Sequence, residues 1–277
     1  MVEPQSTPSR TDGSETLSVA TWNIRSGRNG GLESACRALD SLGVDVAVLQ
    51  ETKLTGGIYT RLSSGYSIVA TDAPSSHQGG IALAWKDDGD AFEVEATRIW
   101  HPHVLSFQLV TGRDRFFVVG CYMPPGDLEA FEAVKMAWLA CPRGCKPLLI
   151  GDLNIDLDSP RDDREDTIAE ECDAMDLTEM SQHFCQPRKG LARGRWSWRM
   201  QRRRRWVSSR PDYFLAQENS RRCFRRVVLK MPRHHDSDHR AVIASIYGGP
   251  LRRIKAYRRR RSRFPIRLPF FGPRTQD

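Results

Sequence analysis

The stretch Pro147-Leu148-Leu149-Ile150-Gly151-Asp152-Leu153-Asn154 decides the fold expected for this chain. Its apolar run after a proline predicts a buried strand of an α/β protein, with a turn at Gly151. Because residues two apart in an extended segment point the same way, Asp152 and Asn154 are expected to lie together at the carboxyl end of the strand. Ligands commonly bind at that end, and a carboxylate beside an amide can align a water or a phosphate oxygen. Taken alone, the pattern fits a polar loop equally well.

Length and composition fit one large α/β domain. The chain has 277 residues, 39% of them hydrophobic, and holds no apolar run of the roughly 18 residues that a membrane span needs. Its N-terminus lacks the apolar centre of a secretory signal. Seven cysteines at irregular spacings indicate reduced intracellular thiols, so secretion is not expected. Cys141 and Cys145 make at most half of a zinc site, and we exclude zinc.

The formal net charge of +8 is concentrated at the C-terminus. Residues 251–277 contain 10 Lys or Arg and one acid, whereas the rest of the chain has 32 basic and 33 acidic residues. We therefore expect a catalytic domain at 16–248, flanked by a disordered N-terminal arm at 1–15 and a disordered basic arm at 249–277. A basic arm can bind polyanions or direct nuclear import, and the alternative is a solvated end that binds nothing.

The first part of the chain predicts a βαβ unit. A strand is expected at Leu17–Ile24, a helix from Leu32 to Leu42, and a buried strand at Val44–Leu49. Asn23 and Glu51 then stand at the ends of the two strands. A carboxylate leaving a buried strand is costly unless it is paired or bound to a metal, so Glu51 is a candidate functional residue. The alternative is the first-turn acid of a following helix.

Further strands and two helices are expected in the middle of the chain. The β-like runs follow one another closely, which favours antiparallel pairing and a mixed sheet. They are Tyr66–Ala70, Ile81–Trp85, Val104–Val110 and Phe116–Tyr122. A helix after Asp127 is expected to cover the sheet with Phe131, Val134, Met136 and Leu139, its Met and Trp residues filling the core. The acidic stretch Asp162–Glu179 is expected to form an exposed helix.

The segment Phe184–Arg210 interleaves arginines with Trp196, Trp198 and Trp206. Guanidinium groups pair with phosphates and aromatic rings stack on bases, so this composition predicts a nucleic-acid contact. The alternative places the tryptophans in the core and exposes only the arginines.

Two further motifs carry candidate catalytic groups. Arg210-Pro211-Asp212-Tyr213-Phe214-Leu215 places a carboxylate at the head of an aromatic strand, and Ser237-Asp238-His239 precedes a buried strand at Ala241–Ile246. His239 is therefore available for orientation by a carboxylate from elsewhere, which an imidazole needs in order to act on a phosphate.

Each motif is weak alone, but their order along the chain is specific. That order is Trp22-Asn23, Gln50-Glu51, Tyr122-Met123-Pro124, Gly151-Asp152-Leu153-Asn154, Trp196-Ser197-Trp198, Arg210-Pro211-Asp212-Tyr213-Phe214 and Ser237-Asp238-His239. The set resembles the endonuclease/exonuclease/phosphatase superfamily, and most of all the apurinic-type endonuclease domain of LINE-like non-LTR retrotransposons. The resemblance covers roughly 17–247. It implies a four-layer α/β sandwich of two packed mixed sheets flanked by helices, and magnesium-dependent cleavage of phosphodiesters, with manganese as an alternative metal.

The resemblance also implies roles for individual residues. Metal ligands are expected at Glu51 and Asp238. Asp152 aligns the attacking water with Asn154 beside it, Asn23 and Tyr122 contact the scissile phosphate or leaving oxygen, and His239, oriented by Asp212, stabilises charge on phosphorus. These assignments make a coherent phosphodiesterase site.

Nucleic-acid contacts are expected at Ser197, Trp198, Arg199, Arg203, Arg205, Trp206 and Arg25. Arg25 departs from the family pattern, which often has Asp or Asn at this place to help hold the metal. An arginine cannot ligate magnesium, so either Arg25 turns outward toward DNA or metal binding is weaker than usual.

The leading functional hypothesis is a magnesium-dependent DNA endonuclease of retrotransposon origin that leaves a 3′ hydroxyl. Its expected partner is DNA, with no protein partner and no membrane, and it is expected to be a monomer in the nucleus or elsewhere in the cell. No reverse-transcriptase region accompanies these motifs, so an isolated domain, an element fragment or a domesticated copy is expected. The alternatives are a phosphoinositide or other phosphodiester hydrolase of the same fold, and a catalytically decayed basic nucleic-acid-binding protein.

Overall fold

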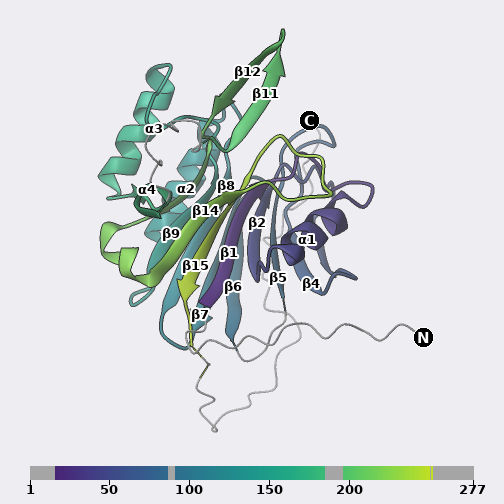
Figure 1. The fold of residues 1–277 in the computed structure, drawn as a ribbon. Helices are drawn as coiled ribbons and strands as arrows, with labels where there is room; N and C mark the ends of the chain where they lie inside the picture. The colour runs from purple at the N-terminus through teal and green to yellow at the C-terminus, as the bar shows by residue number, and fades with distance from the viewer. Residues whose placement is uncertain (1–15, 87–90, 185–195, 250, 252–277) are drawn as a thin grey trace, which may run out of the picture.

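The computed structural model describes residues 16–86, 91–184, 196–249 and 251 (Figure 1). The expected N-terminal arm at 1–15 lies outside these residues, as does the expected C-terminal arm except for Gly249 and Leu251. Within the described part of the chain, none of the helices combines the length and apolarity that crossing a membrane requires.

One mixed sheet has seven strands in the order β14-β15-β1-β2-β5-β4-β3. Strands β1 and β2 are parallel and joined by α1 (Gly31–Ser41), which confirms the predicted βαβ unit. The other neighbours in this sheet pair antiparallel. The strands are β1 (Thr16–Asn23), β2 (Val46–Gln50), β3 (Ile58–Arg61), β4 (Tyr66–Ala70), β5 (Ile81–Lys86), β14 (Phe224–Lys230) and β15 (Ala241–Tyr247).

The second mixed sheet has six strands in the order β10-β13-β9-β8-β7-β6. Its only parallel pair among the described strands is β8 with β9, connected through α2 (Leu128–Leu139). The strands are β6 (Phe92–His101), β7 (Val104–Thr111), β8 (Arg115–Tyr122), β9 (Lys146–Asp152), β10 (Thr178–Glu179) and β13 (Asp212–Ala216).

The two sheets pack face to face with helices on the outside, as the sequence predicted (Figure 1). Val48, Phe107 and Ile150 belong to the fully buried core between the sheets. The outer face of the first sheet packs against α1, and that of the second packs against α2 and α3 (Asp163–Ala174). This is a four-layer α/β sandwich, stabilised mainly by burial of apolar surface in three layers.

Gly151 has a different role from the one predicted. It lies inside β9, where a side-chain Cβ would stand 2.0 Å from the carbonyl oxygen of Cys121 on β8. Glycine is therefore required for close approach of two backbones, and the expected turn at this residue was wrong.

The two predicted helices differ from expectation at their edges. On α2, Phe131 and Val134 cover the sheet, but Met136 is 55% exposed and Leu139 is 84% exposed, so these two do not fill the core. The acidic helix α3 ends at Ala174 and does not reach Glu179, because the chain turns at Asp176 with a φ of 55° and then forms β10.

A two-stranded hairpin of β11 (Trp198–Arg202) and β12 (Arg205–Ser209) projects beyond the sandwich (Figure 1). The remaining described elements are α4 (Ser181–Phe184) and the 3₁₀-helix η1 (Glu218–Cys223). Strands β3, β6 and β14 were not predicted. All three are edge strands with mostly exposed or half-exposed side chains, so they lack the apolar signal of a buried strand.

Candidate active site

The ends of several strands bring polar side chains to one edge of the sandwich. Tyr122, Asp152 and Asp212 are aligned on β8, β9 and β13, because Asp152 pairs in register with both of the others. Asn23 ends β1 on the other sheet, and its Nδ2 donates to Asp152 Oδ2 over 2.8 Å. The site therefore joins the two sheets, as α/β folds allow at strand ends.

Asp152, Asp212 and His239 form a buried cluster at the centre of this edge. Each offers a ligand atom within 4.8 Å of the other two. Asp212 Oδ2 lies 2.8 Å from His239 Nδ1, a pairing that the family resemblance implied, while Asp212 Oδ1 has no hydrogen-bond partner among the described residues. Trp22 Nε1 donates to the backbone oxygen of His239 over 3.1 Å. The Asp212 carboxylate thus orients the imidazole, and the Trp22 indole holds the backbone that carries it.

The electrostatics of the cluster favour a charged imidazole. Burial and the neighbouring Asp212 carboxylate raise the pKa of Asp152 to about 7. For His239, burial alone would lower the pKa, but the Asp212 carboxylate outweighs it and raises the pKa to about 9. At neutral pH His239 is therefore a cation that can donate to a developing negative charge.

Asp152 is held on both carboxylate oxygens. Besides the bond from Asn23, its Oδ1 accepts from the backbone N–H of Asn154 over 2.9 Å. Asn154 adopts a left-handed conformation with a φ of 53°, and its Nδ2 donates to the Met123 carbonyl over 2.9 Å. These contacts place Asn154 beside Asp152, but through a tight turn after the strand and not by continued strand alternation.

Glu51 lies next to two donors. Tyr122 Oη donates to Glu51 Oε1 over 2.9 Å, and Lys53 Nζ is 2.8 Å from Glu51 Oε2. Burial and the Glu51 carboxylate raise the pKa of Tyr122, so the phenol stays protonated. Sequence reasoning missed Lys53, although its position two residues after Glu51 was a usable signal.

Asp238 lies between an indole and Arg25. Trp198 Nε1 donates to Asp238 Oδ2 over 3.0 Å, and Arg25 Nε is 3.6 Å from Asp238 Oδ1. The Arg25 side chain is 50% exposed, so it faces both Asp238 and solvent. Arg25 therefore reaches solvent, as the outward-turning alternative expects, and it also lies beside Asp238, an expected metal ligand.

Carboxylates at the site suit a hard divalent cation, and two groups of described residues could hold a metal ion. These are Asp152 with Asp212 and His239, and His101 with His103 and Asp127. Glu51 and Asp238 also have the right donor chemistry, and Asp212 Oδ1 is a buried oxygen without a hydrogen-bond partner among the described residues. Both expected metal ligands, however, already face a positively charged side chain: Glu51 faces Lys53 and Asp238 faces Arg25. A metal ion would have to share each carboxylate with that side chain.

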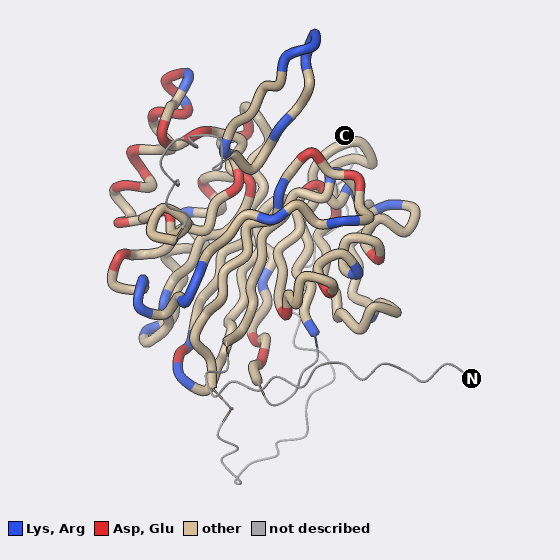
Figure 2. The backbone as a smooth tube through the Cα atoms, in the orientation of Figure 1, with Lys and Arg blue, Asp and Glu red and all other residues tan. Residues whose placement is uncertain are grey.

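The hairpin carries most of the expected nucleic-acid contacts that the structure describes (Figure 2). Trp206 is 58% exposed, and the guanidinium of Arg199 lies 4.2 Å from the centre of its ring. Arg203 adopts a positive φ of 41° at the turn, and Arg205 begins β12. The basic residues Arg188, Lys189, Arg193 and Arg195 lie outside the described residues.

The base of the hairpin is hydrogen-bonded to residues 238–240, the segment that carries Asp238 and His239. Arg199 N donates to the Asp238 carbonyl over 3.1 Å, and Arg240 N donates to the Ser197 carbonyl over 2.6 Å. Ser197 itself is 0% exposed, and its hydroxyl accepts from the backbone N–H of Asp212 over 3.1 Å. Ser197 therefore holds the backbone of Asp212 in place. Because it has no exposed surface, it cannot make the contact with nucleic acid that was expected of it.

Comparison with known proteins gives the same picture. The sequence matches the profile of the Endonuclease/Exonuclease/phosphatase family over residues 20–239. A comparison with curated proteins found no match.

Among solved structures, the chain is similar to the endonuclease domain of TRAS1, a telomere-specific non-LTR retrotransposon. The identity is 17% and the TM-score 0.60, and the match covers 83% of this chain and 98% of that one. It is similar to an AP endonuclease from Archaeoglobus fulgidus, with 16% identity, a TM-score of 0.64 and coverage of 83% and 99%. For the AP endonuclease LMAP from Leishmania major the identity is 18%, the TM-score 0.66 and the coverage 90% and 92%. At this identity the likeness establishes the fold.

Proposed function

This chain belongs to the endonuclease/exonuclease/phosphatase family, and we propose that it is a divalent-metal-dependent DNA endonuclease that leaves a 3′ hydroxyl. The observation that carries the proposal is the buried Asp152–Asp212–His239 cluster, fixed by backbone bonds to the base of an arginine- and tryptophan-bearing hairpin. A phosphodiester held by the hairpin would lie within reach of that cluster.

In the proposed mechanism, water attacks phosphorus in line, the bond from phosphorus to the 3′ oxygen breaks, and the departing 3′ oxygen takes a proton from solvent, which leaves a 3′ hydroxyl and a 5′ phosphate. Asp152, held by Asn23 and by the Asn154 backbone, aligns the water and accepts its proton. His239, charged and oriented by Asp212, donates to the phosphoryl oxygen that gains negative charge. Tyr122 supplies a neutral hydroxyl beside the phosphate or the leaving oxygen. Magnesium, or manganese in its place, would be held by Glu51 and Asp238 and would offset the phosphate charge.

DNA is the proposed substrate because the hairpin offers both kinds of group that single and double strands require. Stacked Arg199 and exposed Trp206 can take a base or sugar, while the turn arginines take phosphates. We propose a retrotransposon origin from the similarity to the TRAS1 domain. A nuclear location and a monomeric state follow from this proposal, in which one chain carries a complete site for genomic DNA.

The first test is nicking of supercoiled plasmid at low salt by the purified full chain, with titrated magnesium or manganese. We expect conversion to open circles whose nicks are extended by a DNA polymerase, which requires a 3′ hydroxyl. Chelation with EDTA is expected to stop the reaction. Plasmid that stays intact with both metals contradicts the enzyme proposal.

The pairing of Arg25 with Asp238 and of Lys53 with Glu51 favours a second candidate, a basic nucleic-acid-binding protein without catalysis. Gel-shift binding without cleavage, unchanged in Asp152→Ala, would support it. Hydrolysis of a phosphoinositide in place of DNA would support the remaining alternative, a phosphodiester hydrolase of the same fold. A lipid substrate would leave the hairpin without a role.

Replacing Trp206 with alanine is expected to raise the KM for DNA by roughly tenfold and to leave kcat nearly unchanged, because one stacking platform is lost. Arg199→Ala is expected to act in the same direction, since its guanidinium lies on the same ring. Arg222→Ala, an exposed arginine on η1, is the matched control. Equal effects of Trp206→Ala and the control on KM in steady-state nicking would remove the hairpin from the proposed interface.

A further inference from the structure

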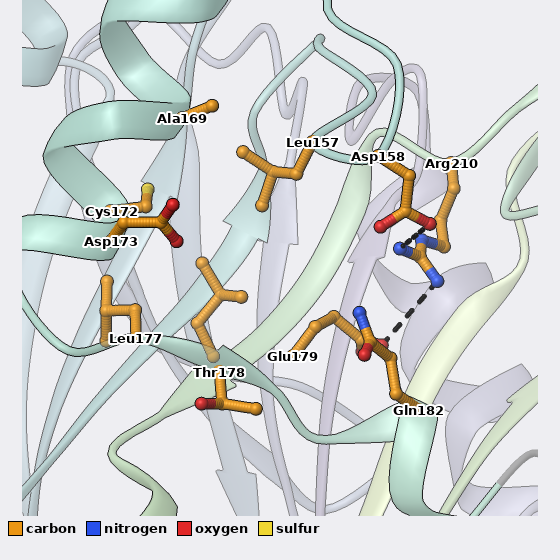
Figure 3. Close-up of a pocket in the computed structure, with 11 residues that line it drawn as sticks. Leu157, Asp158, Ala169, Cys172, Asp173, Leu177, Thr178, Glu179, Gln182 and Arg210 are labelled. Carbon is orange, nitrogen blue, oxygen red and sulfur yellow. Dashed lines mark hydrogen bonds and ion pairs between the residues drawn. The ribbon is translucent and has the colours of Figure 1, made fainter.

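A cavity of about 280 Å³ beside the second sheet contains a buried arginine that the proposed mechanism does not use (Figure 3). The cavity lies between α3, β10 and the start of β13. Its apolar lining includes Leu157, Cys172 and Leu215, and its polar lining includes Asp158, Glu179 and Arg210. Figure 3 shows the Arg210 guanidinium extending between Asp158 and Glu179.

The Arg210 guanidinium is almost fully enclosed, with its side chain 5% exposed. Its Nη2 donates to Asp158 Oδ2 over 2.7 Å, and its Nη1 lies 3.6 Å from Glu179 Oε2. Burial by itself disfavours the charged form, but Glu179, Tyr213 and Asp158 outweigh it and raise the pKa of Arg210. The Nε and Nη1 atoms have no hydrogen-bond partner among the described residues, so the 2.7 Å pair with Asp158 is the contact that joins Arg210 firmly to another segment.

The segment that carries Asp158 is the loop that leaves the catalytic strand β9. Leu153 N donates to the Pro211 carbonyl over 2.8 Å, and Leu157 N donates to Tyr213 Oη over 2.8 Å. Together with the pair between Arg210 and Asp158, these bonds attach the loop at three places to residues 210–213, which lead into β13. The same loop contains Asn154, whose N–H fixes Asp152, while β13 begins with Asp212.

We propose that Arg210 is a positioning residue, which holds the loop 153–158 against β13 and so fixes Asp152 relative to Asp212 and His239. The expected effect of Arg210 on the rate of nicking rests on the proposed function, whereas its attachment of the loop 153–158 to β13 does not. Arg210 follows the last residue of β12, but its side chain is only 5% exposed and touches no reacting group, so it is expected to act on the rate and not by contacting DNA. A displacement of about 1 Å at a reacting group can cost roughly 100-fold in rate.

The test compares Arg210→Ala with the wild type in steady-state nicking and in amide hydrogen exchange. We expect kcat to fall by roughly 10- to 100-fold, KM for DNA to stay within about twofold, and exchange at Leu153 and Leu157 to accelerate. Methylguanidinium at millimolar concentration is expected to enter the space left by the side chain and restore part of kcat in Arg210→Ala, but not in Asp152→Asn. Arg161→Ala is the matched control, because it breaks an arginine–carboxylate pair with Glu165 inside one segment.

Arg210→Lys keeps the charge but loses the planar fork, so we expect an intermediate kcat and a folded protein if the alanine variant fails to fold. An unchanged kcat together with wild-type exchange in the loop overturns the proposal, and so does a rise in KM with kcat unchanged. Should wild-type protein nick no DNA, the proposed function fails, and the exchange measurement still decides whether Arg210 holds the loop.

Discussion

Replacing Asp152 with asparagine is expected to slow plasmid nicking by about 1,000-fold, because the variant keeps the size of the side chain but loses the base that aligns the attacking water. The carboxylate is fully buried and held on both oxygens, so no neighbouring group can take its place. Single-turnover nicking measures the effect, and Asp152→Ala is expected to be at least as slow. Gel-shift affinity for the same plasmid should be unchanged or tighter, since one negative charge is removed.

The same substitution is expected to make the stability of the fold less dependent on pH, while its amide sets an N–H group against one of the two donors that Asp152 accepts from. Burial and Asp212 raise the pKa of Asp152 to about 7, so the ionised form destabilises the folded state. Stability from this group is present at acidic pH and is lost as the pH rises from the unfolded pKa, about 4, toward 7. The change in Tm caused by Asp152→Asn should therefore be more favourable at pH 8 than at pH 5, as measured by thermal unfolding. A change in Tm that is equal at the two pH values would contradict this prediction.

Replacing His239 with glutamine is expected to lower kcat by roughly 100- to 10,000-fold, since the donor to the developing negative charge is lost. Asp212→Asn is expected to cost a similar amount, because the imidazole then loses both its charge and its orientation. The double variant should be little slower than either single one, as residues that act as a unit are not additive. Single-turnover nicking of all three variants measures this, and additive losses would contradict a coupled pair.

The pair also makes a prediction about stability. Asp212 raises the pKa of His239 to about 9 against the burial that opposes it, so protonated His239 stabilises the folded state. This contribution is fully present below the ordinary pKa of histidine, about 6.5, and is lost as the pH rises through 9. The difference in Tm between wild type and His239→Gln should therefore shrink between pH 6.5 and pH 10. A Tm difference that does not change with pH would mean that His239 stabilises the fold only through packing.

Much of the site could be predicted because its residues follow or precede buried strands. Apolar runs marked β1, β2, β8, β9 and β15, and strand ends in an α/β fold meet at common edges. The pairing of Asp212 with His239 came from the resemblance and is confirmed by the geometry.

Features that depend on pairing between distant segments could not be predicted. Ser197 is buried because Asp212 and Arg240 bond to it, and neither contact leaves a local trace in the sequence. The role of Gly151 depends on how closely Cys121 approaches from the neighbouring strand. The arginine- and tryptophan-rich stretch was expected to form a loop or a hairpin, and its strands could not be placed because most of their side chains are exposed.

The backbone bonds between the hairpin base and residues Asp238 to Arg240 have a mechanical consequence. If the hairpin binds DNA as proposed, a bent or ill-fitting duplex would apply a force at the hairpin tip, and those bonds would transmit it to the loop that carries His239. A poorly seated target would then tilt the imidazole before the bond is cut, while a well-seated one would leave it undisturbed. Discrimination between targets would accordingly depend on the stiffness of the β11–β12 hairpin as much as on which bases its tip contacts.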